Sequence, residues 1–306
     1  MAWAVLSNMV VYHVASGQAF FSGAASILAA VALASFLRDG WLHRRRHVLL
    51  VLGVLLVGLS ATPLPISAYV LLAAVSLAWL ACDVAARLPG RWRKVSRAGM
   101  GVAWIAAVLV ELPYHFMPAV VIRPPAGPQG AGTRNSEPVL GIIGDSVTAG
   151  MGADEAVTWP KLLANARGIP IRDHSRMGAK VASAREQAAA LSAGESLVLL
   201  EIGGNDVLGS TRPAEFERGL EQLLNDVGRP GRTVIMFELP LPPLFNAYGL
   251  IQRRLARRHG VVLIPKRVLL GVLRRDGATL DSVHLSQAGH ERMAELVWDV
   301  VRPAFE

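Results

Sequence analysis

The first 122 residues contain uncharged apolar stretches that are long enough to cross a membrane. The clearest of them covers residues 19–37, and a helix of this length can span a hydrocarbon core of about 30 Å. The four stretches predicted to span are residues 19–37, 47–61, 66–86 and 99–117. A hydrophobic content of 52% and a mean hydropathy of +0.39 are too high for a soluble enzyme of 306 residues. The sequence therefore predicts an all-α transmembrane region of about four helices over residues 1–117.

Two parts of this region are less regular than the rest. The stretch 47–61 is short for a membrane span, and residues 1–18 are interrupted by polar side chains. The first 18 residues could extend the first helix, lie at the membrane interface or form a fifth span. No Lys or Arg precedes Arg38, so the positively charged start of a signal peptide is absent.

Basic residues are concentrated between the predicted spans. Nine of the 31 Lys and Arg residues lie between Arg38 and Arg97, whereas residues 123–306 hold 22 basic and 20 acidic residues. The net charge of +8 therefore indicates membrane loops rather than a nucleic-acid surface. By the positive-inside rule we expect loops 38–47 and 87–97 in the cytoplasm and the C-terminal half outside it. This arrangement suggests a multi-pass protein of a bacterial inner (cytoplasmic) membrane.

The C-terminal half alternates short apolar runs with amphipathic segments. It follows a Pro/Gly-rich linker over residues 118–138. Strands are predicted at residues 139–144, 169–172, 196–202, 232–238 and 261–264, and helices at 159–167, 179–191, 213–227, 246–259 and 286–301, with Ser286 as an N-cap. Such alternation predicts a mainly parallel sheet covered on both faces, with functional groups at the carboxyl ends of its strands.

Four polar segments follow these predicted strands. Gly144-Asp145-Ser146 ends the first strand, a segment around Gly178 follows the second, and Gly203-Gly204-Asn205-Asp206 follows the third. Asp281-Ser282-Val283-His284 lies after the fifth, ahead of the last helix. A serine is a poor nucleophile unless a base, itself oriented by a third group, lies within hydrogen-bond reach. Each segment alone is a common turn, but their order and their placement at strand ends favour a catalytic site.

Together these segments resemble the SGNH (GDSL) family of serine esterases and lipases over about residues 139–301. The resemblance implies a three-layer, flavodoxin-like α/β sandwich with a five-stranded sheet over residues 139–306. It implies that Ser146 is the nucleophile, that His284 is the general acid and base, and that Asp281 orients the imidazole.

The resemblance also implies an oxyanion hole. The backbone N–H groups of Ser146 and Gly178 and the side-chain amide of Asn205 would bind the negative oxygen of the tetrahedral intermediate. Asp145 and Asp206 are interpreted as supporting residues that shape the loops behind these groups.

Other polar residues have simpler interpretations. The lone Cys82 excludes an intrachain disulfide, and no cofactor or metal site is expected, because no dinucleotide, phosphate-loop or metal-ligand spacing is present. Glu111 lies inside the fourth predicted span and is either functional or placed at headgroup level. The four arginines of the helix 246–259 could face anionic headgroups or, more simply, water; they are Arg253, Arg254, Arg257 and Arg258.

The leading hypothesis is a membrane-anchored hydrolase of carboxylic esters outside the cytoplasm. Its substrate would be an ester-bearing lipid, glycan or small molecule, with no nucleic-acid partner, and its oligomeric state is left open. Acyl transfer to a glycan or lipid hydroxyl is one alternative. The other is a non-catalytic membrane sensor or scaffold, which would not need Ser146, Asn205, Asp281 and His284 together.

Overall fold

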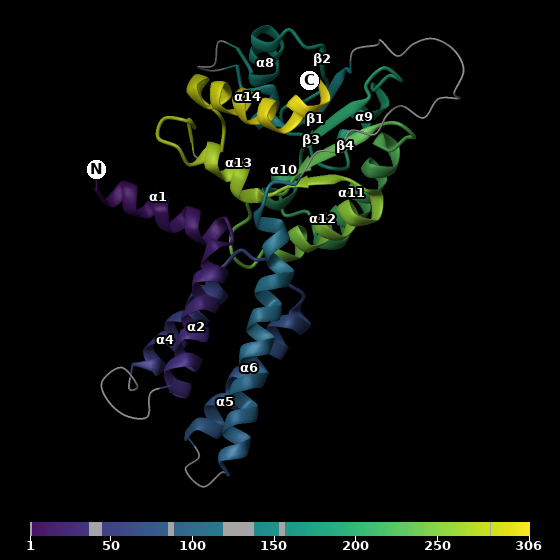
Figure 1. The fold of residues 1–306 in the computed structure, drawn as a ribbon. Helices are drawn as coiled ribbons and strands as arrows, with labels where there is room; N and C mark the ends of the chain where they lie inside the picture. The colour runs from purple at the N-terminus through teal and green to yellow at the C-terminus, as the bar shows by residue number, and fades with distance from the viewer. Residues whose placement is uncertain (1, 37–44, 85–88, 119–137, 153–156, 282) are drawn as a thin grey trace. The chain divides into compact units, whose positions relative to one another are not determined.

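The structure, a computed structural model, describes residues 2–36, 45–84, 89–118, 138–152, 157–281 and 283–306. The chain forms two compact units (Figure 1). One comprises Met1–Phe116 with Leu241–Asn246, and the other comprises Met117–Pro240 with Ala247–Glu306. Nearly all of the predicted linker lies outside the described residues.

The N-terminal helices of the first unit are mostly apolar. They are α1 (Ala2–Ala15), α2 (Gln18–Phe36), α4 (Arg46–Leu59), α5 (Ile66–Val84) and α6 (Gly90–Glu111), which continues as the 3-10 helix η1 (Leu112–His115). Among the described residues, three helical stretches could cross a membrane by length and composition: α2, α5 and Gly90–His115. The 14 residues of α4 measure about 21 Å, less than a hydrocarbon core of about 30 Å. A turn at Gly17 (φ 86°) separates α1 from α2, so residues 1–18 do not simply extend the first helix.

The second basic segment is mainly helical. The sequence predicts a loop over residues 87–97, which is wrong from Gly90 onward, because α6 begins there with Pro89 at its N-cap. Arg97 of α6 and Arg46 of α4 both pair with Asp83 of α5, at 3.3 and 2.7 Å. The Asp83 carboxylate thus compensates part of the basic charge at these helix ends. Residues 38–44 and 87–88 of the predicted loops lie outside the described residues, as do residues 85–86 of the predicted span 66–86.

Close packing in the helical unit depends on small residues. A Cβ atom on Gly23 of α2 would come within 2.7 Å of the Gly53 carbonyl oxygen of α4. The two helix backbones therefore approach closely, as glycines allow in membrane helices. Trp104 and Ser76, both buried, join α6 to α5 through a hydrogen bond from indole Nε1 to Oγ of 3.1 Å.

The second unit is built on a five-stranded parallel sheet in the order β2-β1-β3-β4-β5. The strands are β1 (Leu140–Gly144), β2 (Ile171–Asp173), β3 (Leu197–Glu201), β4 (Thr233–Phe237) and β5 (Val262–Ile264). The three central strands are buried along their whole length and are rich in Val, Ile and Leu, as strands covered on both faces are. The predicted parallel α/β sheet is confirmed.

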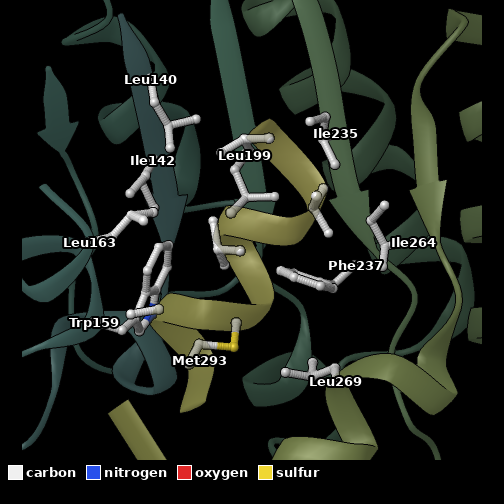
Figure 2. Packing of buried hydrophobic residues seen from close by; sticks show 14 of the residues in the cluster. Leu140, Ile142, Trp159, Leu163, Leu199, Ile235, Phe237, Ile264, Leu269 and Met293 are labelled. Carbon is white, nitrogen blue, oxygen red and sulfur yellow. The ribbon is translucent and has the colours of Figure 1, made fainter. Parts of the chain in front are cut away.

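Helices flank this sheet. They are α7 (Ser146–Ala149), α8 (Trp159–Arg167), α9 (Ala184–Ala189), α10 (Gly204–Leu208), α11 (Pro213–Val227), α12 (Asn246–His259), α13 (Lys266–Leu273) and α14 (Gln287–Val301), ending in η2 (Arg302–Ala304). Figure 2 shows α8, α13 and α14 contributing Trp159, Leu269 and Met293 to one core with strand residues such as Ile142 and Phe237.

Most predicted elements of this unit are confirmed within one or two residues. The helices α8, α11 and α12 match their predicted bounds, and the Ser286 hydroxyl caps α14 by accepting the Gly289 N–H at 3.2 Å. The prediction of a helix over 179–191 is too long, because only Ala184–Ala189 is α-helical. The short helices α7 and α10 and the eight-residue helix α13 were not predicted.

Candidate active site

The turn after β1 presents the hydroxyl of Ser146. The Asp145 side chain caps α7 by accepting the Val147 N–H at 3.0 Å, and the Asp145 carbonyl accepts the N–H of Ala149 at 2.8 Å. The chain therefore changes from strand to helix within one residue. Ser146 becomes the first residue of α7, and it is only 6% exposed.

His284 lies between Ser146 and Asp281. Its Nε2 is 3.1 Å from Ser146 Oγ, and its Nδ1 is 2.6 Å from Asp281 Oδ2. The sequence separation of Ser146 and His284 is 138 residues, so only the fold brings them together. The geometry is a serine–imidazole–carboxylate chain of hydrogen bonds, in which the imidazole can exchange a proton with the hydroxyl.

The local turn around Asp281 keeps its carboxyl group ionised. Hydrogen bonds from the His284 backbone N–H and imidazole, and from the Val283 N–H, lower the pKa of Asp281 to about 2. The carboxylate therefore stays negative through the whole neutral range. A negative charge at Nδ1 favours the imidazolium form that arises when His284 takes a proton from Ser146.

Two further predicted residues lie in adjoining segments, Asn205 in the short helix α10 after β3 and Gly178 after β2. The Asn205 side-chain amide donates a hydrogen bond to the Ala179 carbonyl, at 3.1 Å, which ties the loop after β3 to the loop after β2. Gly178 has φ 72°, a left-handed conformation that favours glycine. A Cβ on Gly178 would meet no described atom within 4 Å, so the backbone conformation, rather than crowding by the protein, accounts for the glycine.

Asp145 and Glu201 form a pair of buried carboxyl groups at this turn. Their side chains are hydrogen-bonded to each other, and Thr148 Oγ1 donates to Glu201 Oε2 at 2.9 Å. Burial raises the pKa of Asp145 to about 6, while burial and the neighbouring charge of Asp145 raise the pKa of Glu201 further above its usual range. This hydrogen bond lowers the pKa of Asp145 and raises that of Glu201, so a proton shared by the pair is held by Glu201 and donated to Asp145.

The loop containing Asn205 is held by Asp206. The Oδ2 atom of Asp206 accepts the Val181 N–H at 2.9 Å, and burial raises the pKa of its carboxyl group. Gly203, which precedes this loop, has φ 112°, and a Cβ there would come within 3.0 Å of Phe216. Packing and backbone conformation together thus favour glycine at the end of β3.

Sequence reasoning missed three supporting residues. Glu201 and Thr148 form the contact described above, and Gln187 both donates to the Gly144 carbonyl and accepts its N–H, each at 3.0 Å. A signal for Glu201 exists, because it is the one charged residue in the apolar strand β3. Nothing local marks Gln187, since its partner is 43 residues away.

Other polar side chains that could have been functional make contacts within the fold instead. His290, a second histidine six residues after His284, is fully buried in α14, and its Nδ1 accepts the Trp159 N–H at 3.2 Å. The prediction that the arginines of α12 face water is wrong for Arg253, which is 3% exposed and pairs with Glu238 at 2.6 Å. Its neighbours Arg254 and Arg258 pair with Glu217 and Glu221, each at 2.5 Å. In the part of the chain that the structure describes, no three His, Cys, Asp or Glu residues are placed to hold a metal ion.

The fold and this site define the class of the protein. Residues 142–292 match the model of the GDSL-like Lipase/Acylhydrolase family, and the C-terminal unit is an SGNH (GDSL)-type serine esterase or lipase domain.

Similar proteins are bacterial. Esterase TesA of Pseudomonas aeruginosa is 25% identical over 179 residues, which are 53% of this chain and 87% of that protein. The Escherichia coli K12 protein named thioesterase 1/protease 1/lysophospholipase L1 is 29% identical over 133 residues, 40% of this chain and 64% of that protein.

Solved structures of similar proteins also cover about half of this chain. A crystal structure of TesA is 28% identical, with a TM-score of 0.47, and covers 54% of this chain and 99% of the TesA chain. The psychrotrophic esterase EstA from Pseudoalteromonas is 19% identical, with a TM-score of 0.49, over 55% of this chain and 98% of its own.

Proposed function

We propose that this protein is a membrane-anchored serine hydrolase that cleaves carboxylic esters outside the cytoplasm. The observation that carries the proposal is the continuous contact from Ser146 Oγ through His284 to Asp281, at 3.1 and 2.6 Å. The hydrolase domain covers residues 139–306, and the apolar helices before it anchor it as a domain over residues 1–117.

The reaction begins when Ser146 Oγ attacks the ester carbonyl carbon. The hydroxyl proton passes to Nε2 of His284, whose Nδ1–H donates to Asp281. Collapse of the tetrahedral intermediate breaks the bond to the alcohol oxygen, which takes the proton from Nε2 and leaves an acyl group on Ser146. Water then attacks the acyl-enzyme with His284 as base, releasing the acid and restoring the serine.

The oxyanion of each intermediate is stabilised by three donors. These are the backbone N–H groups of Ser146 and Gly178 and one N–H of the Asn205 amide, whose other N–H is used by the Ala179 carbonyl. Each such donor contributes roughly 3–4 kcal/mol in the transition state. Asp145 and Asp206 support this arrangement by fixing the Val147 and Val181 N–H groups, at 3.0 and 2.9 Å.

The positive-inside bias supports the membrane orientation. Arg44 and Arg45 precede α4 and Arg46 begins it, and the first turns of α6 contain Arg91, Arg93, Lys94 and Arg97. By contrast, residues 1–37 and the turn 62–65 contain no Lys or Arg. Helix starts rich in arginine resist translocation as short loops do, so these ends of α4 and α6 are cytoplasmic and the chain leaves α6 on the other side.

The proposal is tested by labelling the full-length protein in detergent micelles with a fluorophosphonate. Native protein should be labelled at Ser146 and hydrolyse esters from a panel of graded acyl chain length. Ser146→Ala should lose both properties, while Ser35→Ala, a serine of α2, should keep them. Full ester hydrolysis by Ser146→Ala would overturn the mechanism.

Acyl transfer is the second candidate function. The acyl-enzyme on Ser146 has the same structure whether water or a glycan or lipid hydroxyl attacks it, so the triad supports either outcome. Product analysis with an added alcohol acceptor separates the two: a transferase forms the new ester in preference to the free acid.

A further inference from the structure

Exposed large apolar side chains of the hydrolase unit are concentrated at one edge of its sheet. Apart from Met117 at its first residue, the described members of this set lie in segments that follow β1, β2 and β3, or in the segment of Asp281 and His284, which follows α13. They are Met151 (41% exposed), Met177 (59%), Leu208 (69%), Leu280 (41%) and Val283 (37%). The carboxyl ends of parallel strands share one edge, which is the edge that carries Ser146.

Hydrogen bonds and close contacts connect the segments that carry these side chains. The Lys180 ammonium lies within 2.8 Å of a Cβ placed on Gly209, so the segment after Met177 adjoins the one that contains Leu208. The Leu280 N–H donates to the His284 carbonyl at 2.8 Å, and His284 contacts Ser146. The segments of Met177 and Leu208 therefore adjoin each other, and the segment of Leu280 adjoins Ser146.

We propose that these five side chains, the apolar rim, insert into a phospholipid surface and admit ester-bearing lipids from it to Ser146. This inference rests on the proposed function and names the substrate class. Soluble proteins rarely expose contiguous apolar surface unless it binds a partner or a membrane. Here the apolar side chains lie in segments at the sheet edge that carries Ser146, so an apolar partner bound to them would be close to the reacting atom.

The rest of the chain favours lipid as the partner. Besides the rim and Leu244 and Phe245 after β4, the described large hydrophobics that are exposed belong to the N-terminal segment up to Met117, whose helices could span a membrane. Contact with lipid would account for the exposed apolar side chains of both the rim and the N-terminal segment. The 24 residues between His115 and Leu140 reach at most about 85 Å when fully extended, so a membrane-spanning N-terminal segment would limit how far the hydrolase unit can move from the bilayer.

Lys180 suits a phospholipid surface as well. It lies in the same segment as Met177, and its ammonium group is 3.5 Å from Thr211 Oγ1. A basic side chain beside an apolar insertion site attracts anionic headgroups. We therefore expect the rim to bind vesicles that contain phosphatidylglycerol better than vesicles of phosphatidylcholine alone.

Fluorescence quenching tests the insertion directly. The full-length Cys82→Ser protein is reconstituted in phosphatidylcholine vesicles with a minority of phosphatidylglycerol, and a fluorophore is attached through Leu208→Cys or Leu280→Cys. The matched control is Asn225→Cys, an exposed position near the end of α11 that precedes the amino end of β4. Lipid carrying a doxyl group on its acyl chain should quench the two rim positions, and iodide in the water should quench position 225.

Two results would overturn the proposal. One is quenching of positions 208 and 280 by iodide with no effect of doxyl lipid. The other is equal quenching of all three positions by doxyl lipid, because the rim would then have no special role. Fluorophosphonate labelling of Ser146 in the same vesicles separates the two hypotheses. If Ser146 is labelled but doxyl lipid does not quench the rim positions, insertion of the rim is refuted and the hydrolase function is not. If Ser146 is not labelled, the proposed hydrolase function is refuted.

Substrate dependence gives a second measurement. The variant Leu208→Ser should keep its turnover of a short, water-soluble ester, because Leu208 is not part of the catalytic groups. Its turnover of a long-chain lipid ester presented in vesicles should fall about tenfold, the effect expected for losing one large apolar anchor. Equal effects on both substrates would contradict insertion into lipid.

Discussion

Two buried carboxyl groups, those of Asp145 and Glu201, are hydrogen-bonded to each other at the turn that presents Ser146. Each residue is 3% exposed, and Glu201 also accepts the hydroxyl of Thr148, at 2.9 Å. The pair connects the end of β3 to the residues on both sides of Ser146. Its single proton lets two acidic residues lie side by side without the repulsion of two charges.

This pair makes stability depend on pH. Because the folded protein holds these protons to higher pH than the unfolded chain does, it should lose stability as pH rises from about 4, through the pKa of about 6 for Asp145 and beyond. Glu201→Gln keeps a donor for Asp145 and an acceptor for Thr148 but cannot ionise. At alkaline pH the variant should be more stable than the native protein by on the order of 1 kcal/mol, measured by denaturant unfolding in micelles.

Glu201→Ala is the matched control, since it removes both the charge and the hydrogen bonds. We expect it to be less stable than the Gln variant at every pH. Parallel pH profiles for Glu201→Gln and the native protein would contradict a shared proton.

Asn205→Ala should lower kcat by about 10²–10³-fold with a small change in KM. The amide is expected to bind the oxygen of the tetrahedral intermediate, so its loss matters most once negative charge develops. Steady-state kinetics with a soluble ester measures both constants, and Asn225→Ala on α11 is the control. A raised KM with unchanged kcat would make Asn205 a substrate-binding residue instead.

Asp281→Asn should lower kcat by about 10⁴-fold, as loss of the carboxylate that orients a catalytic histidine does. The native carboxyl group has a pKa of about 2, so it remains charged across the accessible pH range. The native pH–rate profile should therefore show no limb from titration of Asp281. Asp276→Asn, an exposed aspartate of the preceding turn, should keep native activity in the same assay.

Reporter fusions test the orientation of the chain. A reporter that is active only after export should be active when fused after Glu306 and silent when fused at Arg45, because arginine-rich helix ends stay in the cytoplasm. A reporter that works only in the cytoplasm should give the opposite pattern. Activity of the cytoplasmic reporter at Glu306 would overturn the orientation and the extracytoplasmic substrate with it.

Local patterns in the sequence determined the elements of the fold. The apolar runs of β1, β3 and β4 and the amphipathic helices α8, α11 and α12 follow from the chemistry of neighbouring residues, so they were predicted within one or two positions. The motif containing Ser146 stands at the end of β1 for the same reason, whereas α13 lies between β5 and the motif containing His284. Their mutual contact could be expected because parallel strands end at a common edge.

Tertiary structure alone decided which polar side chains meet. Gln187 reaches Gly144 over 43 residues and Thr148 reaches Glu201 over 53, and neither separation leaves a local pattern. The start of α6 at Gly90 was also not predicted, because a run of basic residues is typical of a solvated loop. In the folded chain, Asp83 pairs with Arg97 and Arg46. Burial and charge depend on neighbours that only the folded chain supplies. The shared proton of Asp145 and Glu201 is therefore a property of the fold, although both residues are present in the sequence.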